Sequence, residues 1–132
     1  MSRESVELVR RVIDAFNRRD VDALRALNHP DIEIDWSASL GPEPRIYRGP
    51  EEAAEFFNNY LGIFERVHLV PERFIDSGDL VVVPNTAQLR GRDGIQTVAR
   101  SALVYEVRGG RILRLRLHQE TSDALDAVGL SE

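Results

Sequence analysis

The chain has 132 residues, of which 42% are hydrophobic and 30% charged, and its formal net charge is −5. This length and composition are typical of one globular domain, and no lysine or arginine cluster offers a surface for nucleic acid. The sequence contains no cysteine, and its longest aliphatic run, LVVV at 80–83, is too short to span a bilayer. We therefore expect a cytoplasmic protein of one domain, 1–132, without a nucleic-acid or membrane partner.

The N-terminal part predicts two helices and a strand. Apolar residues recur at helical spacing up to Asn17, and Ser2 stands where it can cap this first helix. Asp20 is placed to cap a second, shorter helix, VDALRAL at 21–27. In DIEIDW, 31–36, apolar and acidic residues alternate, which predicts a half-buried strand with its acidic residues outward.

The clearest helix signal lies in the middle of the chain. The preceding segment SASLGPEPRI, 37–46, is rich in serine, glycine and proline and predicts a loop placed to act as a lid. Gly49 is expected at the cap of the next helix and Pro50 at its first helical position. Four aromatic residues between 56 and 64 give this helix a heavy apolar face.

After Gly62 the pattern changes to strands. Long β-type segments at 66–77, 80–91, 95–107 and 111–119 are separated by glycine-containing turns. Ser122 is then expected to cap a short terminal helix that ends at Gly129. This order predicts an α+β fold, in which helices cover one face of a curved antiparallel sheet.

Four stretches carry a family resemblance: VRRVIDAFNRRDVDALRALNHPDIEIDW, YRGPEEAAEFFNNY, DSGDLVVV and VRGGRILRLRLHQETSDALDAVGL. In this order they resemble the nuclear-transport-factor-2-like superfamily, in particular its SnoaL-like (polyketide cyclase) and ketosteroid-isomerase-like branches. The resemblance implies a cone-shaped α+β barrel (the cystatin-like or nuclear-transport-factor-2-like type) with a deep apolar pocket. It also implies homodimers that join through the outer face of the sheet.

Ketosteroid isomerisation needs a tyrosine, a base and a protonated acid. The resemblance would place these groups at Val12, Trp36 and near Leu103, whose side chains cannot serve as the tyrosine, the base or the acid. We therefore do not expect this activity.

The epoxide-hydrolase branch uses two acids and an arginine. By resemblance Arg100 matches the arginine and Glu120 the acid of the last strand, but Ala102 stands in place of the second acid. Epoxide opening therefore lacks its proton donor.

A third possibility is acid–base chemistry of the polyketide-cyclase kind. His118 and Glu120 are two residues apart, so on a regular strand both point the same way and could act as base and acid in an apolar cavity. A bulge near Gln119 would instead turn that amide inward. The alternative is that Arg114, Arg116, His118 and Glu120 form one charged ladder facing solvent or a second copy. Arg100, on the neighbouring predicted strand, would either contact an anionic ligand or pair with Glu120.

The remaining candidates are pocket-lining and core residues rather than catalytic groups. Asn85, beside Pro84, is expected to turn its amide inward. The predicted catalytic residues are Glu120, His118 and Arg100, and the predicted pocket residues are Val12, Phe16, Trp36, Tyr47, Phe56, Phe57, Tyr60, Asn85, Leu103 and Gln119.

Two functions fit these residues. One is a cofactor-free acid–base enzyme (a cyclase, isomerase or hydrolase) acting on a hydrophobic cyclic or polyketide-like molecule. The other is a non-catalytic dimeric module that binds a small hydrophobic ligand or a protein through the same cone. No metal or other cofactor is expected, because the three histidines lack ligand spacing and there is no glycine-rich phosphate loop.

Overall fold

A computed structural model describes residues 2–130, apart from the side chain of Ser2, so the predicted capping role of that side chain lies outside the described residues. The elements are α1 (Ser2–Asn17), α2 (Val21–Leu27), β1 (Asn28–Asp35), β2 (Ile46–Arg48), α3 (Gly49–Ile63), β3 (Phe64–Pro71), β4 (Ile75–Ser77), β5 (Leu80–Gly91), β6 (Gln96–Arg108), β7 (Arg111–His118) and α4 (Thr121–Ala127). None of these helices is both long and apolar enough to cross a membrane.

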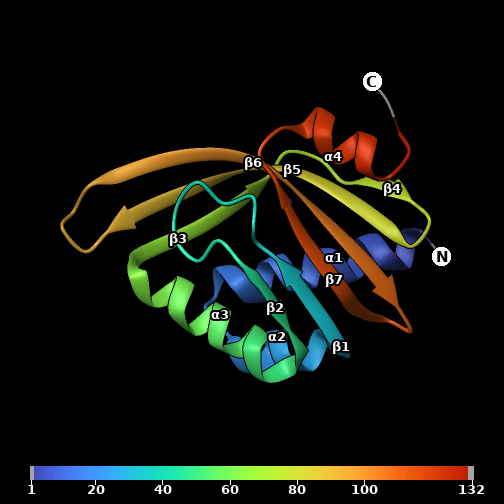
Figure 1. The fold of residues 1–132 in the computed structure, drawn as a ribbon, viewed down its shortest axis with the longest axis horizontal. Coiled ribbons are helices and arrows are strands. Elements are labelled where there is room, and N and C mark those ends of the chain that lie inside the picture. Colours follow the sequence, from blue (N-terminus) through green and yellow to red (C-terminus); the bar gives the residue numbers. More distant parts are fainter. Residues whose placement is uncertain (1, 131–132) are drawn as a thin grey trace.

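The strands form one curved sheet in the order β2-β1-β7-β6-β5-β3, with β4 paired to β5 (Figure 1). The predicted α+β class is confirmed, and the sheet stays open between its edge strands β2 and β3. The prediction of a wholly antiparallel sheet is wrong, because β1 and β7 run parallel. These two strands are far apart in the sequence, so no hairpin turn fixes their relative direction.

Helices lie on both sides of this sheet. The main core joins α1, α2 and α3 to the inner face, including Val9, Leu24 and Phe56. Helix α4 packs on the outer face instead, where Leu125 meets Val82 in a second, smaller cluster. The two faces therefore have different neighbours, and the direction of each strand side chain decides which environment it meets.

Local signals for the short helices are partly confirmed. The Asp20 carboxylate caps α2 by accepting a hydrogen bond from the Ala23 backbone N–H at 3.0 Å, as predicted. The prediction that Ser122 caps α4 is wrong, since Glu120 occupies the cap position and its side chain makes no capping hydrogen bond. Gly129 ends α4 with φ of +80°, a conformation that favours glycine.

Helix α3 carries much of the aromatic core and is held at its C-terminus by two arginine side chains. It begins at Gly49, one residue before the predicted first position, so the predicted cap at Gly49 is shifted to Arg48. At its C-terminus the Arg92 side chain donates to the Gly62 carbonyl oxygen at 2.8 Å, and Arg19 donates to that of Phe64 at 3.1 Å. Both cations lie where the helix dipole is negative.

The predicted strand 66–77 is two strands, β3 and β4, which both pair with β5. In the connection between them the Glu72 backbone N–H donates to the Pro84 carbonyl oxygen at 2.8 Å. This hydrogen bond holds Glu72 against β5, close to the end of the sheet where the chain later leaves β7.

Candidate functional site

An inner cavity of about 150 Å³ lies between the loop at 36–45, helix α3 and the inner face of β5, β6 and β7. Its apolar wall comes from Trp36, Leu40, Tyr60, Leu69, Ala87, Leu89, Leu103 and Leu117, and its polar side chains from Ser39, Asn85, Arg100, Ser101 and Gln119. Pocket-sized cavities with an apolar wall and few polar groups are typical of small-molecule sites.

Two aromatic rings of this wall rest on the buried core. Phe56 is 1% exposed, and its ring centroid lies 5.1 Å from that of Trp36 and 5.7 Å from that of Tyr60. Burial raises the pKa of Tyr60, so its phenol stays protonated at neutral pH. The rings are therefore held in place from behind, and their exposed edges shape the cavity.

The structure divides the predicted pocket residues into two groups. Trp36, Tyr60, Asn85, Leu103 and Gln119 line the inner cavity. The others lie behind it in the core: Val12, Phe16, Tyr47, Phe56 and Phe57.

The two predicted amides both turn toward the cavity and hold its walls. The Asn85 side chain is buried at the cavity wall, and its amide donates to the Val83 carbonyl oxygen at 3.1 Å. The Gln119 side chain donates to the Ala38 carbonyl oxygen at 2.7 Å and so connects the end of β7 to the loop that covers the cavity. Gln119 directly follows β7 and lines the cavity, and the pairing of β7 is regular from Arg114 to its end at His118, without the bulge considered from the sequence.

The alternation of side chains along β7 turns His118 outward, and Glu120, which lies beyond the end of β7 at the cap position of α4, is exposed. His118 lies in a groove of about 150 Å³ beside α4, which Arg116 and Val128 also line. Burial and the positive charge of Arg116 lower the pKa of His118, although Asp123 and Asp35 oppose this shift. His118 is thus close to a charged ladder on the outer face and away from the inner cavity.

Arg100 does not pair with Glu120. Its guanidinium binds the Glu72 carboxylate, with nitrogen–oxygen distances of 2.8 and 2.9 Å. Arg100 and Glu120 do line one open, polar cavity of about 570 Å³, at the side of the sheet where β7 ends. The structure therefore brings two of the three predicted catalytic residues to one surface, and their catalytic role stays a prediction.

The acidic side chains of β1 are less exposed than the sequence pattern suggests. Glu33 lies 3.2 Å from Arg114, and Asp35 lies 3.5 Å from Arg116, across the parallel pair β1–β7. Burial alone raises the pKa of Asp35, but hydrogen bonds from Ser37 and the charge of Arg116 outweigh it, so this pKa is lowered. The ladder expected on the outer face of β7 is present, and its partners come from β1.

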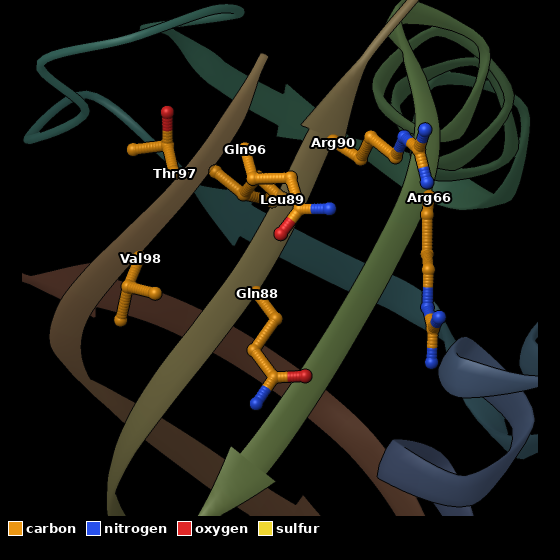
Figure 2. A pocket seen from close by; sticks show the side chains of 7 residues that line it. All are labelled: Arg66, Gln88, Leu89, Arg90, Gln96, Thr97 and Val98. Atoms are coloured by element: carbon orange, nitrogen blue, oxygen red, sulfur yellow. The ribbon is translucent and has the colours of Figure 1, made fainter. Parts of the chain in front are cut away.

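A separate hollow of about 320 Å³ lies on the outer face of β3, β5 and β6 (Figure 2). Arg66 of β3 is directly opposite Arg90 of β5, and Gln88 of β5 is directly opposite Val98 of β6. Val98 is 67% exposed. This surface points away from the inner cavity and combines positive charge, amides and exposed aliphatic groups.

Solved structures with the same architecture support the fold. A nuclear-transport-factor-2-like protein of unknown function from Burkholderia pseudomallei K96243 is 23% identical, covers 97% of this chain and 98% of its own, and has a TM-score of 0.76. A Mycobacterium tuberculosis protein in complex with estradiol-17β-hemisuccinate is 18% identical, with 89% and 94% covered and a TM-score of 0.78. An LEH-like epoxide hydrolase of M. tuberculosis is 19% identical, with 96% and 90% covered and a TM-score of 0.74.

These similarities show that the chain shares the α+β fold of these proteins. The SnoaL-like domain model matches residues 9–115, and the chain therefore belongs to the SnoaL-like family. A search among curated protein sequences finds no match.

Proposed function

We propose that this chain binds a small hydrophobic molecule in its inner cavity and performs no acid–base catalysis there. The observation that carries this proposal is the chemistry of the lining. Among the described residues that line the cavity there is no aspartate, glutamate or histidine, and the Tyr60 phenol is held protonated. General acid–base catalysis needs a titrating group within hydrogen-bond reach of the ligand.

The fold neighbours support the binding part of this proposal. One of them is solved with a steroid hemisuccinate, which has an apolar ring system. Another is an epoxide hydrolase, so the fold alone does not separate binding from catalysis. The lining of this chain favours binding, and a catalytic role for His118, Glu120 and Arg100 stays the competing prediction.

Trp36 is the only tryptophan of the sequence and lines the cavity, so its fluorescence reports on occupancy. We expect a saturable fluorescence change on titration with the neutral probe 3-phenylpropanamide. Ala87→Phe places a ring in the cavity and is expected to weaken binding about tenfold or more, because burial of a phenyl ring is worth about 1.5–3 kcal/mol.

The matched control is Gln88→Phe, which adds the same ring to the next residue of β5 on the outer face. We expect this variant to bind the probe as the wild type does. Equal binding by the wild type and Ala87→Phe would place the probe elsewhere and contradict the proposal.

We also propose that two copies join through the outer face of β3, β5 and β6. Exposed Val70 and Val98 support this, at 38% and 67% exposure, as does the family resemblance. Val98→Lys adds a positive charge to the hollow that Arg66 and Arg90 also line, and is expected to give a monomer in sedimentation velocity. The control Ile63→Lys, at the exposed end of α3, should leave the assembly unchanged. A wild type that sediments as a monomer at every concentration contradicts this interface.

The cytoplasmic location of the protein stays a prediction.

A further inference from the structure

The inner cavity does not end in a closed wall where β7 stops. The inner cavity and the outer polar cavity share three lining residues, Arg100, Ser101 and Gln119. Pairing between β6 and β7 begins at Ala102 and His118, so the stretch of β6 from 96 to 101 has no partner strand on that side. The two cavities therefore meet around this free edge of β6.

The two compartments differ in chemistry. The inner one, of about 150 Å³, has an apolar wall, whereas Glu72, Arg73, Arg100 and Glu120 bring two charges of each sign to the outer one. Cavities that enclose a whole ligand of ordinary drug size measure about 300–1,000 Å³. The inner cavity therefore has room for one ring or a short aliphatic group, and the part of a larger ligand that extends into the outer cavity meets Arg100.

We propose that the natural ligand is an amphipathic anion, whose apolar end fills the inner cavity and whose carboxylate-like group binds Arg100 in place of Glu72. This inference rests on the proposed binding function. In the structure Glu72 supplies a carboxylate to Arg100, with both of its oxygens within 2.9 Å of Arg100 Nη2. The guanidinium is thus already oriented for a carboxylate at the junction of the two compartments.

Exchange of the two carboxylates is energetically feasible. The side chain of Arg100 is 70% exposed and that of Glu72 38%, so water screens their attraction. Ion pairs in such positions change an equilibrium by about fivefold at most. A ligand whose ring is already bound in the inner cavity presents its anion at high local concentration, and this favours it over Glu72.

The test compares two probes that differ only in charge, 3-phenylpropionate and 3-phenylpropanamide, by Trp36 fluorescence. In the wild type we expect the anion to bind about two- to fivefold more tightly than the amide, and this preference to fall with added salt. Arg100→Gln should remove the preference, so that this variant binds the anion and the amide with equal affinity. Glu72→Gln removes the competing carboxylate, so the preference should rise by a further two- to fivefold or so.

The opposite effects of these two variants separate ligand contact from a merely structural ion pair, since loss of a structural pair would affect both variants alike. Arg66→Gln, which removes an arginine from the outer face of β3, is the charge-matched control and should keep the wild-type preference. If the amide binds but the anion binds no more tightly than the amide, this inference is wrong while the proposed function stands. The same holds if the anion keeps its full preference in Arg100→Gln. If neither probe binds, the proposed function itself is contradicted.

Discussion

Phe56→Ala is expected to lower the free energy of unfolding by about 3–5 kcal/mol, the largest effect of any single truncation considered. The Phe56 ring is 1% exposed and contacts four other rings, those of Trp36, Tyr47, Phe57 and Tyr60. Its removal opens a cavity that these rings cannot all close at once. A loss of this size is a large fraction of the stability of an ordinary domain, about 5–15 kcal/mol.

Urea unfolding of the wild type and the variant measures this loss. Phe74→Ala is the matched control, because Phe74 is a half-buried ring with Arg10 stacked on it at 4.3 Å from the centroid. We expect this control to cost about 1–2 kcal/mol. Equal losses in the two variants would show that the aromatic cluster has no special part in stability.

The same substitution links stability to function. Phe56 supports Trp36 and Tyr60 from behind, and both of these rings line the inner cavity. In Phe56→Ala they can tilt into the new space, so we expect binding of 3-phenylpropanamide to weaken even under conditions where the variant is fully folded.

Local sequence signals predicted elements well where turns bound them on both sides. The segment 80–91 is β5 as expected, since glycine turns at Gly78 and Gly94 limit its pairing. The three-residue strand β2 was not predicted, and only its first residue, Ile46, falls in the predicted loop 37–46. A strand of this length has too few residues to show alternation. The direction and register of the strands were harder to predict from the sequence, since the parallel pairing of β1 with β7 depends on contacts between distant segments.

The pairing register of β6 and β7 decides which side chains near the site could be assigned to a face of the sheet from the sequence. A register shift between Glu106 and Val107 puts Ile112 in the core although it is an odd number of residues from Leu115 and Leu117, and no feature of the sequence marks this shift. Beyond this shift the alternation is regular, so the charged ladder on the outer face follows from the leucine pattern. The Arg100–Glu72 pair was missed because Glu72 lies in the connection between β3 and β4, where no periodicity applies.

Asn17→Leu is expected to cost about 2–4 kcal/mol, the second large effect. The Asn17 side-chain amide donates to the Leu69 carbonyl oxygen at 2.9 Å and its oxygen accepts from the Leu69 N–H at 2.8 Å. Strand β3 is an edge of the sheet, so this one side chain takes the place of a neighbouring strand. An apolar residue of similar size leaves both backbone groups unpaired beside the core. Because both hydrogen bonds are only partly buried, the cost of each lies in the lower part of the range of about 1–3 kcal/mol.

Asn17→Asp distinguishes lost hydrogen bonds from altered packing, because its effect depends on pH. The carboxylate still accepts from the Leu69 N–H, but its second oxygen faces the Leu69 carbonyl without a proton. Protonation restores a donor, so folding raises the pKa of the new carboxyl above its unfolded value. The folded variant then binds the proton more tightly, and its stability deficit relative to the wild type shrinks as the pH falls through the raised pKa. Urea unfolding across a pH series measures this, and the Asn17→Leu deficit should stay constant over the same range. A parallel course for both variants would mean that the amide contributes only its volume, and that the edge of β3 is held by packing alone.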